Sequence, residues 1–367
     1  MKSIWEDTRE GTYESFAEVK DCYDALTDDL SRRVFLARMA FDLGEWDGYL
    51  ELIRCSGLMQ EEEIRANFAW VDEFARTQKP VYIYGAGQFG GHTCRMLQRK
   101  HVNIAGFFDR NATNIGSRCG LPVLVPPTGG GKWDYHIFVS LSLPVDEIAA
   151  SLHGRGVLEE LVLNRTMFRA DVEHQYFDFP QYYRGDGAFV DAGCFDCDTS
   201  IRFAAWSGGN YQKIVALEPD PANLQHARDN AAFHQIPRIE FLQAGIWNVT
   251  QSGSFGTMGN YSSRVIESGG EPIQLVALDD IMEKERLAFL KMDIEGAEMK
   301  ALEGAAQTLK RDRPLCAISA YHKPGDQIAL MQYLKCLVPE YRFTLRHYTT
   351  LAVETVLYAF IPHSGIG

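Results

Sequence analysis

The chain has 367 residues, a length typical of two domains with an appendage, and its hydrophobic content of 46% is enough for a sizeable core. Its formal net charge of −13 argues against a broad nucleic-acid interface and against docking on anionic lipid, since both need clustered Lys and Arg. The start of the chain has no apolar signal-peptide core, no apolar run is long enough to span a bilayer, and the 8 cysteines are scattered as in reduced proteins. We therefore expect a cytoplasmic globular protein with no nucleic-acid partner and no membrane span.

Residues 1–78 are predicted to be a helical N-terminal segment. Apolar residues recur there at spacings of four and three, which places them on one face of a helix: Ile64, Phe68, Val71 and Phe74. Such a segment packs on its own domain or forms a homodimer surface. The sequence does not choose between these two.

A smaller α/β domain is predicted for residues 79–165, where strands and helices alternate. A strand runs into Gly85-Ala86-Gly87-Gln88-Phe89-Gly90, the glycine pattern of a dinucleotide-binding turn, and a second strand ends in Asp109, where a ribose-binding acid is expected. The candidate residues of a second nucleotide site are therefore Gly85, Gly87, Gly90 and Asp109. Alternatively, these glycines serve only the tight turn and close helix–strand contact, because a fold does not fix its ligand.

The stretches Gly106-Phe107-Phe108-Asp109 and Gly120-Leu121-Pro122-Val123 resemble a pattern of small N-terminal domains in enzymes of glycan assembly. Those domains bind nucleotides or sugar nucleotides, so the resemblance implies a sugar-nucleotide partner here. Residues 166–187, aromatic and polar, are predicted to be a linker that straps the domains together or covers the second domain's cofactor.

A larger α/β domain is predicted for residues 188–367. An apolar strand enters a tight turn after Asp191 at Gly193, a helix begins near Thr199, and the next strand ends in Glu218. This order describes the first half of a nucleotide-binding sheet. The turn lacks the run of glycines that a pyrophosphate needs, so we predict S-adenosylmethionine, which carries two ribose hydroxyls and no phosphate.

Later strands of this domain end at Gly245, Asp293 and His322. Because open parallel sheets bind ligands beyond the carboxyl ends of their strands, these residues should converge with the earlier strand ends on one crevice. Two closing strands, over residues 341–346 and 355–361, can pair antiparallel. The predicted cofactor-binding residues are Asp191, Gly193, Phe195, Thr199, Glu218, Pro219, Asp220, Asn223, Ala244, Gly245, Ile246 and Asp293.

Several of these residues have predicted roles. Gly193 allows the backbone to approach the ligand closely. The Glu218 carboxylate can accept both ribose hydroxyls in charge-assisted bonds, each worth about 1.5–3 kcal/mol. Asp191 holds the ammonium of the methionyl tail or anchors the turn. Gly245, followed by Ile246, borders the adenine.

The signature Phe289-Leu290-Lys291-Met292-Asp293-Ile294-Glu295-Gly296-Ala297-Glu298 resembles that of the FkbM family of class I S-adenosylmethionine-dependent methyltransferases. Leu278-Asp279-Asp280 and Tyr321-His322-Lys323-Pro324 match it too. The resemblance implies a Rossmann-like sheet with an antiparallel C-terminal hairpin, preceded here by the smaller Rossmann-like domain and the helical segment. It also implies O-methylation of sugars, polyketides or other secondary metabolites. Cys197 departs from the pattern, since many relatives have glycine at the end of this turn.

The catalytic candidates are Asp293, His322 and Glu295. An alcohol is a poor nucleophile until a base removes its proton, so His322 or Asp293 is predicted to deprotonate the acceptor while Glu295 positions the substrate or loop. A helix-dipole role for Glu295 and a loop-bonding role for His322 are the structural alternatives. We predict no metal, although these three residues could hold a divalent ion. His347 could rim the acceptor site or pack in the core.

The predicted function is therefore an S-adenosylmethionine-dependent O-methyltransferase acting on a hydroxyl of a sugar, glycan or secondary metabolite. A NAD-dependent sugar-nucleotide oxidoreductase is the first alternative, weakened because no hydride-transfer constellation follows the N-terminal glycines. A catalytically inactive binding protein is the second.

Overall fold

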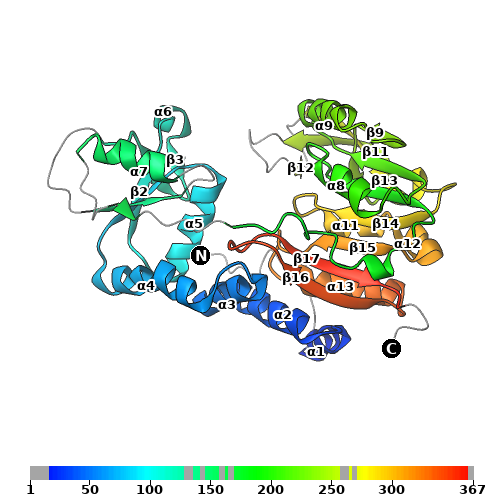
Figure 1. The fold of residues 1–367 in the computed structure, drawn as a ribbon, viewed down its shortest axis with the longest axis horizontal. Helices are drawn as coiled ribbons and strands as arrows, with labels where there is room; N and C mark the ends of the chain where they lie inside the picture. The colour runs from blue at the N-terminus through cyan, green and yellow to red at the C-terminus, as the bar shows by residue number, and fades with distance from the viewer. Residues whose placement is uncertain are drawn as a thin grey trace. The chain divides into compact units, whose positions relative to one another are not determined.

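The computed structural model describes residues 16–127, 135–140, 145–156, 162–163, 169–256, 264–266 and 271–362. The chain divides into two compact units (Figure 1). The larger consists of Met1–Met39, Asp171–Tyr348 and Val353–Gly367, and the smaller of Ala40–Ala170 and Thr349–Ala352. Both are built on mostly parallel sheets, which confirms the predicted α/β class. None of the helices in the described ranges is long and apolar enough to span a membrane.

The larger unit contains a seven-stranded sheet in the order β16-β17-β15-β14-β7-β8-β9. Its strands are β7 (Ala188–Ala192), β8 (Lys213–Leu217), β9 (Ile239–Leu242), β14 (Leu287–Met292), β15 (Leu315–Ser319), β16 (Arg342–His347) and β17 (Thr355–Phe360). β17 runs antiparallel to both of its neighbours, whereas the pairs from β15 to β9 are parallel. The predicted antiparallel closing pair is therefore confirmed, and its second strand lies inside the sheet.

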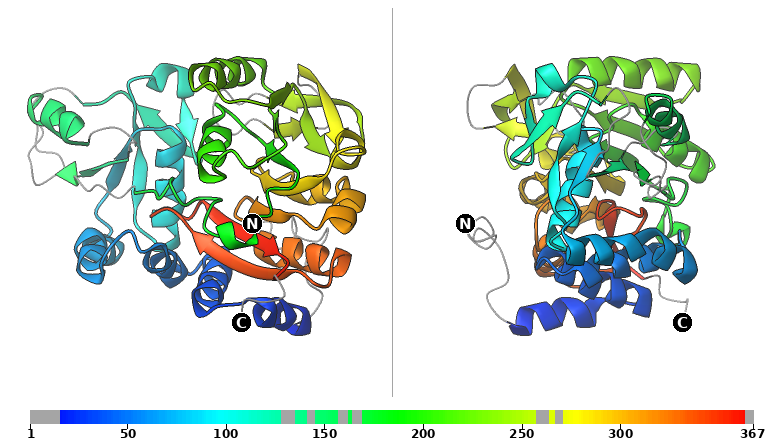
Figure 2. Two further views of the ribbon diagram at one scale, coloured as in Figure 1. Left: turned by 45° about the vertical axis from the view of Figure 1, so that its right-hand side comes forward. Right: turned by 90° about the vertical axis from the view of Figure 1, so that its left-hand side faces the viewer.

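Helices cover both faces of this sheet (Figures 1 and 2). They are α8 (Asp198–Trp206), α9 (Pro221–Phe233), α10 (Leu278–Ile281), α11 (Glu298–Glu303), α12 (Ala306–Asp312) and α13 (Asp326–Leu337). An aromatic core fills one face, where the rings of Phe189 in β7 and Phe203 in α8 stack with centroids 3.9 Å apart. Helices α11 and α12 are separated at Gly304, which packs so closely on the Trp247 carbonyl that a Cβ would lie 2.1 Å from the oxygen.

A second, four-stranded sheet in the larger unit has the order β10-β13-β11-β12. Its strands are β10 (Gly245–Trp247), β11 (Gln251–Gly256), β12 (Arg264–Ile266) and β13 (Glu271–Ala277). Residues 257–263, between β11 and β12, lie outside the described residues.

Residues 171–187, most of the predicted linker, belong to the larger unit. They include the 3₁₀ helix η2 (Pro180–Tyr182), and the Tyr182 ring stacks on Phe360 of β17 with centroids 3.8 Å apart. Tyr176 and Phe177 are buried in the aromatic core. This stretch is therefore part of the folded domain, because its aromatic side chains cover one face of the sheet. Residues 166–168 lie outside the described residues.

The described part of the predicted helical segment 1–78 contains α1 (Phe16–Ala25), α2 (Asp29–Asp42), α3 (Trp46–Ser56) and α4 (Glu61–Thr77), and residues 1–15 lie outside the described residues. The structure divides this segment between the units, at a point within α2. Helix α1 contacts α13, and Asp28 before α2 pairs with Arg346 of β16 at 3.2 Å. Helices α3 and α4 pack on the smaller sheet and bury the predicted apolar face: Ile64, Phe68, Val71 and Phe74. The segment is divided because α1 packs on α13 of the larger unit, whereas α3 and α4 bury their apolar residues against the smaller sheet.

The smaller unit has a six-stranded sheet in the order β3-β4-β2-β1-β5-β6. Its elements are β1 (Val81–Tyr84), α5 (Gln88–Arg99), β2 (Ile104–Phe108), α6 (Ala112–Ile115), β3 (Ser117–Arg118), β4 (Leu121–Leu124), β5 (His136–Val139), α7 (Val145–His153) and β6 (Val162–Leu163). All pairs except β3–β4 are parallel. Gly90 lies where α5 touches the end of β1, so a Cβ there would be 1.8 Å from the Gly85 carbonyl oxygen.

Gly193, at the turn after β7, is required for two separate reasons. Its φ of +75° lies in the left-handed region, and a Cβ would be 2.0 Å from the Asp293 carbonyl oxygen. Gly208 has a similar φ of +61° but open space around its Cβ position. We expect Gly208→Ala to cost about 1–2 kcal/mol of unfolding free energy through φ alone. Gly193→Ala should cost about 1–3 kcal/mol more, because the backbone must also move apart.

Urea denaturation of both variants measures this difference. Equal losses for Gly193→Ala and Gly208→Ala would show that the approach to Asp293 does not constrain the turn.

Candidate active site

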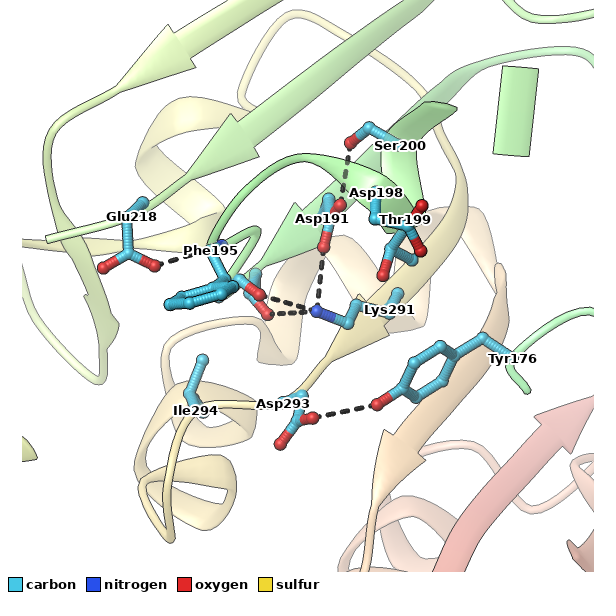
Figure 3. Close-up of polar contacts among 12 residues, drawn as sticks. Tyr176, Asp191, Phe195, Asp198, Thr199, Ser200, Glu218, Lys291, Asp293 and Ile294 are labelled. Atoms are coloured by element: carbon cyan, nitrogen blue, oxygen red, sulfur yellow. Dashed lines mark hydrogen bonds and ion pairs between the residues drawn. The ribbon is translucent and has the colours of Figure 1, made fainter. Parts of the chain in front are cut away.

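Three neighbouring strands bring the predicted site residues together at their carboxyl ends. β14, β7 and β8 are adjacent and parallel, and they are followed by Asp293, Gly193 and Glu218 respectively. The Asp293 backbone N–H donates to the Ala192 carbonyl at 3.1 Å, and the Phe195 N–H donates to Glu218 Oε2 at 3.2 Å. These two hydrogen bonds link the end of β7 and its turn to the residues that follow β14 and β8. Figure 3 shows the bond between Phe195 and Glu218.

A buried ion pair lies beneath this site. Lys291 of β14 points at Asp191 of β7, with Nζ 2.9 Å from Oδ1 and the side chains 3% and 0% exposed (Figure 3). Lys291 Nζ also donates to the carbonyl oxygens of Ala192 at 3.3 Å and Gly193 at 2.7 Å, while Ser200 Oγ donates to Asp191 Oδ2 at 2.7 Å. Burial alone would lower the pKa of the Lys291 ammonium, but the carboxylates of Asp191 and Asp293 outweigh burial and raise it.

This geometry favours one of the two predicted roles of Asp191. Its carboxylate is fully enclosed and already serves Lys291 and Ser200, the latter in α8. A carboxylate in that position anchors the turn between β7 and α8. The ammonium of a methionyl tail would have to displace Lys291, so the anchoring role is the one that the contacts support.

Glu218 is held by backbone groups on both sides. Its Oε2 accepts the Phe195 N–H at 3.2 Å and its Oε1 accepts the Asp220 N–H at 3.0 Å. Burial raises the pKa of the Glu218 carboxyl, and these hydrogen bonds, with one to Asn223, oppose the increase. A carboxylate has about four acceptor positions, so beside these three hydrogen bonds about one stays available for a hydroxyl donor.

Other predicted cofactor residues have local structural functions. Asp220 caps α9, since its Oδ1 accepts the N–H groups of Ala222 at 2.8 Å and Asn223 at 3.0 Å. Pro219 lies between Glu218 and this cap, and Thr199 lies in the first turn of α8. Cys197 has a φ of +72°, a conformation that glycine adopts freely. This left-handed backbone conformation explains why the family resemblance leads us to expect glycine at this position.

The catalytic candidates form one cluster around His322. Its Nε2 lies 3.4 Å from Asp293 Oδ1 and 4.0 Å from Glu295 Oε2, and its Nδ1 lies 3.0 Å from Glu298 Oε1. Burial by itself would lower the pKa of the imidazole, but Glu298, Asp293 and Glu295 outweigh burial and raise it to about 10. Burial, with help from Asp293 and Glu298, also raises the pKa of Glu295 to about 7 against the opposing effect of His322.

Several residues of this site were missed from the sequence. Tyr176 donates its hydroxyl to Asp293 Oδ2 at 2.9 Å, and burial, with Asp293 and Glu354 nearby, raises its pKa well above the ordinary value. Glu354, between β16 and β17, accepts hydrogen bonds from Tyr321 and Gln175. Sequence analysis included Glu298 in the family signature but assigned it no role in the site. Nothing local marks Tyr176 or Glu354, since their partners are far away in the chain.

Some predicted residues lie in other parts of the structure. Ala244 and Ile246 are buried around β10, and their place beside the adenine stays a prediction, as does that of Gly245. His347 is buried, with Nδ1 2.9 Å from the Thr355 hydroxyl, so core packing accounts for it. In the smaller unit, Asp109 lies at the glycine turn, where its Oδ2 accepts the Ala86 N–H at 2.8 Å.

A cation site is geometrically conceivable in this cluster. Among the residues described, Asp293, Glu298 and His322 each offer one ligand atom within 4.8 Å of the other two. However, Glu298 Oε1 already accepts the N–H groups of Ile294 at 3.0 Å and Gly296 at 3.4 Å and contacts the imidazole. These contacts account for the cluster without an ion, and we assign no metal to it.

The fold and the site together define a class of protein. A seven-stranded sheet with its inserted antiparallel strand, and acids at the ends of β7, β8 and β14, is the arrangement of class I S-adenosylmethionine-dependent methyltransferases.

Comparison with known proteins identifies the family of this domain. Residues 185–348 match the family model of the methyltransferase FkbM domain. The chain is similar to the solved structure of methyltransferase FkbM from Methylobacillus flagellatus, with 20% identity over 86% of this chain and 98% of that chain and a TM-score of 0.48. Residues 185–348 are therefore an FkbM methyltransferase domain, with S-adenosylmethionine as its cofactor, as the signature predicted.

Two further solved structures are more distant. An rRNA methylase from Streptococcus thermophilus is 14% identical, covers 52% of this chain and 96% of its own, and has a TM-score of 0.33. An O-methyltransferase from Bacillus cereus in complex with SAH is 13% identical, covers 59% and 89%, and has a TM-score of 0.32. No curated protein matches the chain. The family assignment therefore rests on the sequence of residues 185–348.

The buried ion pair predicts a large effect of one substitution. Lys291→Met leaves the Asp191 carboxylate charged and enclosed without its cation, so we expect a loss of about 3–5 kcal/mol in unfolding free energy. Lys213→Met is the matched control, because Lys213 pairs with Glu240 and Glu285 near the surface. That change should cost less than about 1 kcal/mol. Similar losses for the two variants, measured by urea denaturation, would contradict a central role for the pair.

Proposed function

We propose that this protein is an S-adenosylmethionine-dependent O-methyltransferase acting on a hydroxyl of a sugar, glycan or secondary metabolite. The observation that carries the proposal is the position of His322 beside Asp293, which follows β14, the strand next to the one that leads into the Gly193 turn. An imidazole at the methyl-donor end of the sheet is suited to take a proton from an alcohol. The family resemblance supports the acceptor class.

In this proposal Glu218 binds the ribose. Its two backbone donors fix the carboxylate at the end of β8, and its oxygens accept the ribose hydroxyls. Gly193 allows the turn to approach the cofactor, while Phe195, 37% exposed and linked through its N–H to Glu218, offers a ring beside the nucleoside. Asp191 and Lys291 hold the turn in place.

The methyl group is placed near Asp293 at the end of β14. Methyl transfer is a displacement at carbon, so alignment of the acceptor oxygen, the methyl group and the sulfur supplies much of the rate. His322 takes the hydroxyl proton. Tyr176 fixes Asp293 by donating to its Oδ2, which leaves Oδ1 facing the imidazole, and Glu295 borders the acceptor from the exposed side.

The smaller unit is proposed to bind the acceptor, as a nucleotide-linked sugar, through Gly85, Gly87, Gly90 and Asp109. The Asp109 carboxylate accepts N–H groups from Ala86 and Asn111, each at 2.8 Å, and this supports an acid fixed beside the glycine turn. The steric need for glycine at position 90 supports the purely structural alternative equally well.

Removal of the Glu218 carboxylate should weaken cofactor binding. Glu218→Ala deletes one or both charge-assisted bonds to ribose, so we expect the Kd for S-adenosylmethionine to rise about 10–100-fold. Isothermal titration calorimetry measures it, and Glu240→Ala, at an exposed residue of β9, should leave the Kd unchanged. An unaltered Kd for Glu218→Ala would remove the ribose assignment.

The same titration with NAD distinguishes the proposed methyltransferase from a NAD-dependent oxidoreductase. Tight NAD binding without S-adenosylmethionine binding would favour a sugar-nucleotide oxidoreductase. Binding of S-adenosylmethionine without transfer of its labelled methyl group to any of a panel of sugars, sugar nucleotides and secondary metabolites would favour an inactive binding protein.

The proposed base predicts a pH dependence. His322 accepts a proton only when it is neutral, and its raised pKa of about 10 means that the neutral fraction grows as the pH increases from 7 toward 10. We expect kcat/KM for the acceptor found in the panel to rise over this range. His322→Gln should remove the rise and lower kcat about 10²–10⁴-fold.

His234→Gln is the control, because His234 is exposed at the end of α9. It should keep the wild-type profile. Full turnover of His322→Gln with a saturating acceptor would exclude the imidazole as the base.

A further inference from the structure

Glu298, the first residue of α11, is a buried acid with a defined set of partners. Its side chain is 2% exposed. Its Oε1 accepts the backbone N–H groups of Ile294 at 3.0 Å and Gly296 at 3.4 Å. Glu298 thereby closes the loop between β14 and α11, which also carries Asp293 and Glu295.

The same oxygen lies 3.0 Å from His322 Nδ1. The other ring nitrogen, Nε2, faces Asp293 Oδ1 at 3.4 Å and Glu295 Oε2 at 4.0 Å. Neither ring nitrogen makes a hydrogen bond in the structure, so the contact between Nδ1 and Glu298 Oε1 is an ion pair at hydrogen-bonding distance.

The solvent exposure of these side chains shows which side of the imidazole is accessible. The exposed fraction of the side chain rises from 2% at Glu298 through 9% at His322 and 23% at Asp293 to 38% at Glu295. The Nδ1 side of the imidazole is therefore enclosed by protein, and the Nε2 side points toward the accessible part of the site. Only the Nε2 side can meet an incoming hydroxyl.

We propose that Glu298 is a positioning residue: it holds the proton of neutral His322 on Nδ1 and so leaves Nε2 free to accept the proton of the acceptor hydroxyl. Because a ring nitrogen that donates to a carboxylate keeps its proton, the partner of one nitrogen determines the tautomer. The inference rests on the proposed function, since it assigns a partner to the proposed base.

In the proposed methyl transfer, proton removal and bond exchange occur together. The hydroxyl proton moves to Nε2 as the acceptor oxygen forms a bond to the methyl carbon. The bond between methyl carbon and sulfur breaks, and its electron pair stays on sulfur, which gives S-adenosylhomocysteine. The Nδ1 proton stays between the imidazole and Glu298, and the product imidazolium is stabilised by that carboxylate.

Ionisable groups from several elements face His322. They are Asp293 and Glu295 after β14, Glu298 in α11, Asp326 in α13 and Glu354 between β16 and β17, with Lys323 next in the chain. Burial raises the pKa of both Asp326 and Glu354 to about 7. Glu298 differs from the others because it contacts the enclosed nitrogen and bonds to the loop.

Nitrogen-15 NMR of the full chain, labelled at histidine, tests the inference, because the shifts of the two ring nitrogens report both the pKa and the tautomer. His322→Gln identifies the signal. We expect the neutral ring of the wild-type protein to carry its proton on Nδ1. Glu298→Gln keeps an oxygen for the two loop amides but removes the charge, so the pKa of His322 should fall by about one unit or more.

Glu298→Ala removes the acceptor as well, so the neutral ring should shift toward the Nε2–H form. Glu303→Gln removes an acid from the same helix that pairs with Lys300 near the surface, and it should leave the signal unchanged. A wild-type ring protonated at Nε2, or a His322 signal unchanged by Glu298→Gln and Glu298→Ala, overturns the inference and leaves Glu298 as a loop anchor.

The NMR signals are read on the protein without acceptor and with S-adenosylhomocysteine. A failure of the proposed function appears separately, in the methyl-transfer assay and in the turnover of His322→Gln.

Discussion

One buried ion pair holds the cofactor end of this protein together. Lys291 and Asp191 occupy paired positions on β14 and β7, and the ammonium also bonds to the two carbonyl groups that lead into the glycine turn. A charge enclosed to this degree is costly without its partner, so the two strands can meet only in the register that pairs them. That register places Asp293 against Gly193, and the other residues of the site are positioned from there.

Electrostatics links the fold to the proposed chemistry. Glu298, Asp293 and Glu295 surround one imidazole, and together they outweigh its burial. Without ligand this cluster holds a proton on His322. In the proposed mechanism, the same three acids stabilise the imidazolium that forms when His322 takes the proton of the acceptor hydroxyl.

In both units, an acid accepts a backbone hydrogen bond from the first glycine turn. In the smaller unit, the acid after β2, Asp109, accepts the N–H of Ala86 in the turn after β1. In the larger, the acid after β8, Glu218, accepts the N–H of Phe195 in the turn after β7. Each acid is fixed by the turn that it faces. The two turns differ in their surroundings, because the larger unit adds the buried Lys291–Asp191 ion pair beneath its turn and Asp293 beside it.

The sequence by itself determined the strand ends of the larger domain. Asp191, Gly193, Glu218 and Asp293 follow apolar runs in a fixed order, and parallel strands must gather their carboxyl ends at one edge, so local pattern and topology were sufficient. Only the tertiary structure decided the partners of those residues. Tyr176 reaches Asp293 across 117 residues, Glu354 joins the site from the loop between β16 and β17, and the N-terminal helices divide between the two units. Such contacts depend on which buried faces meet, and short-range periodicity carries no information about that choice.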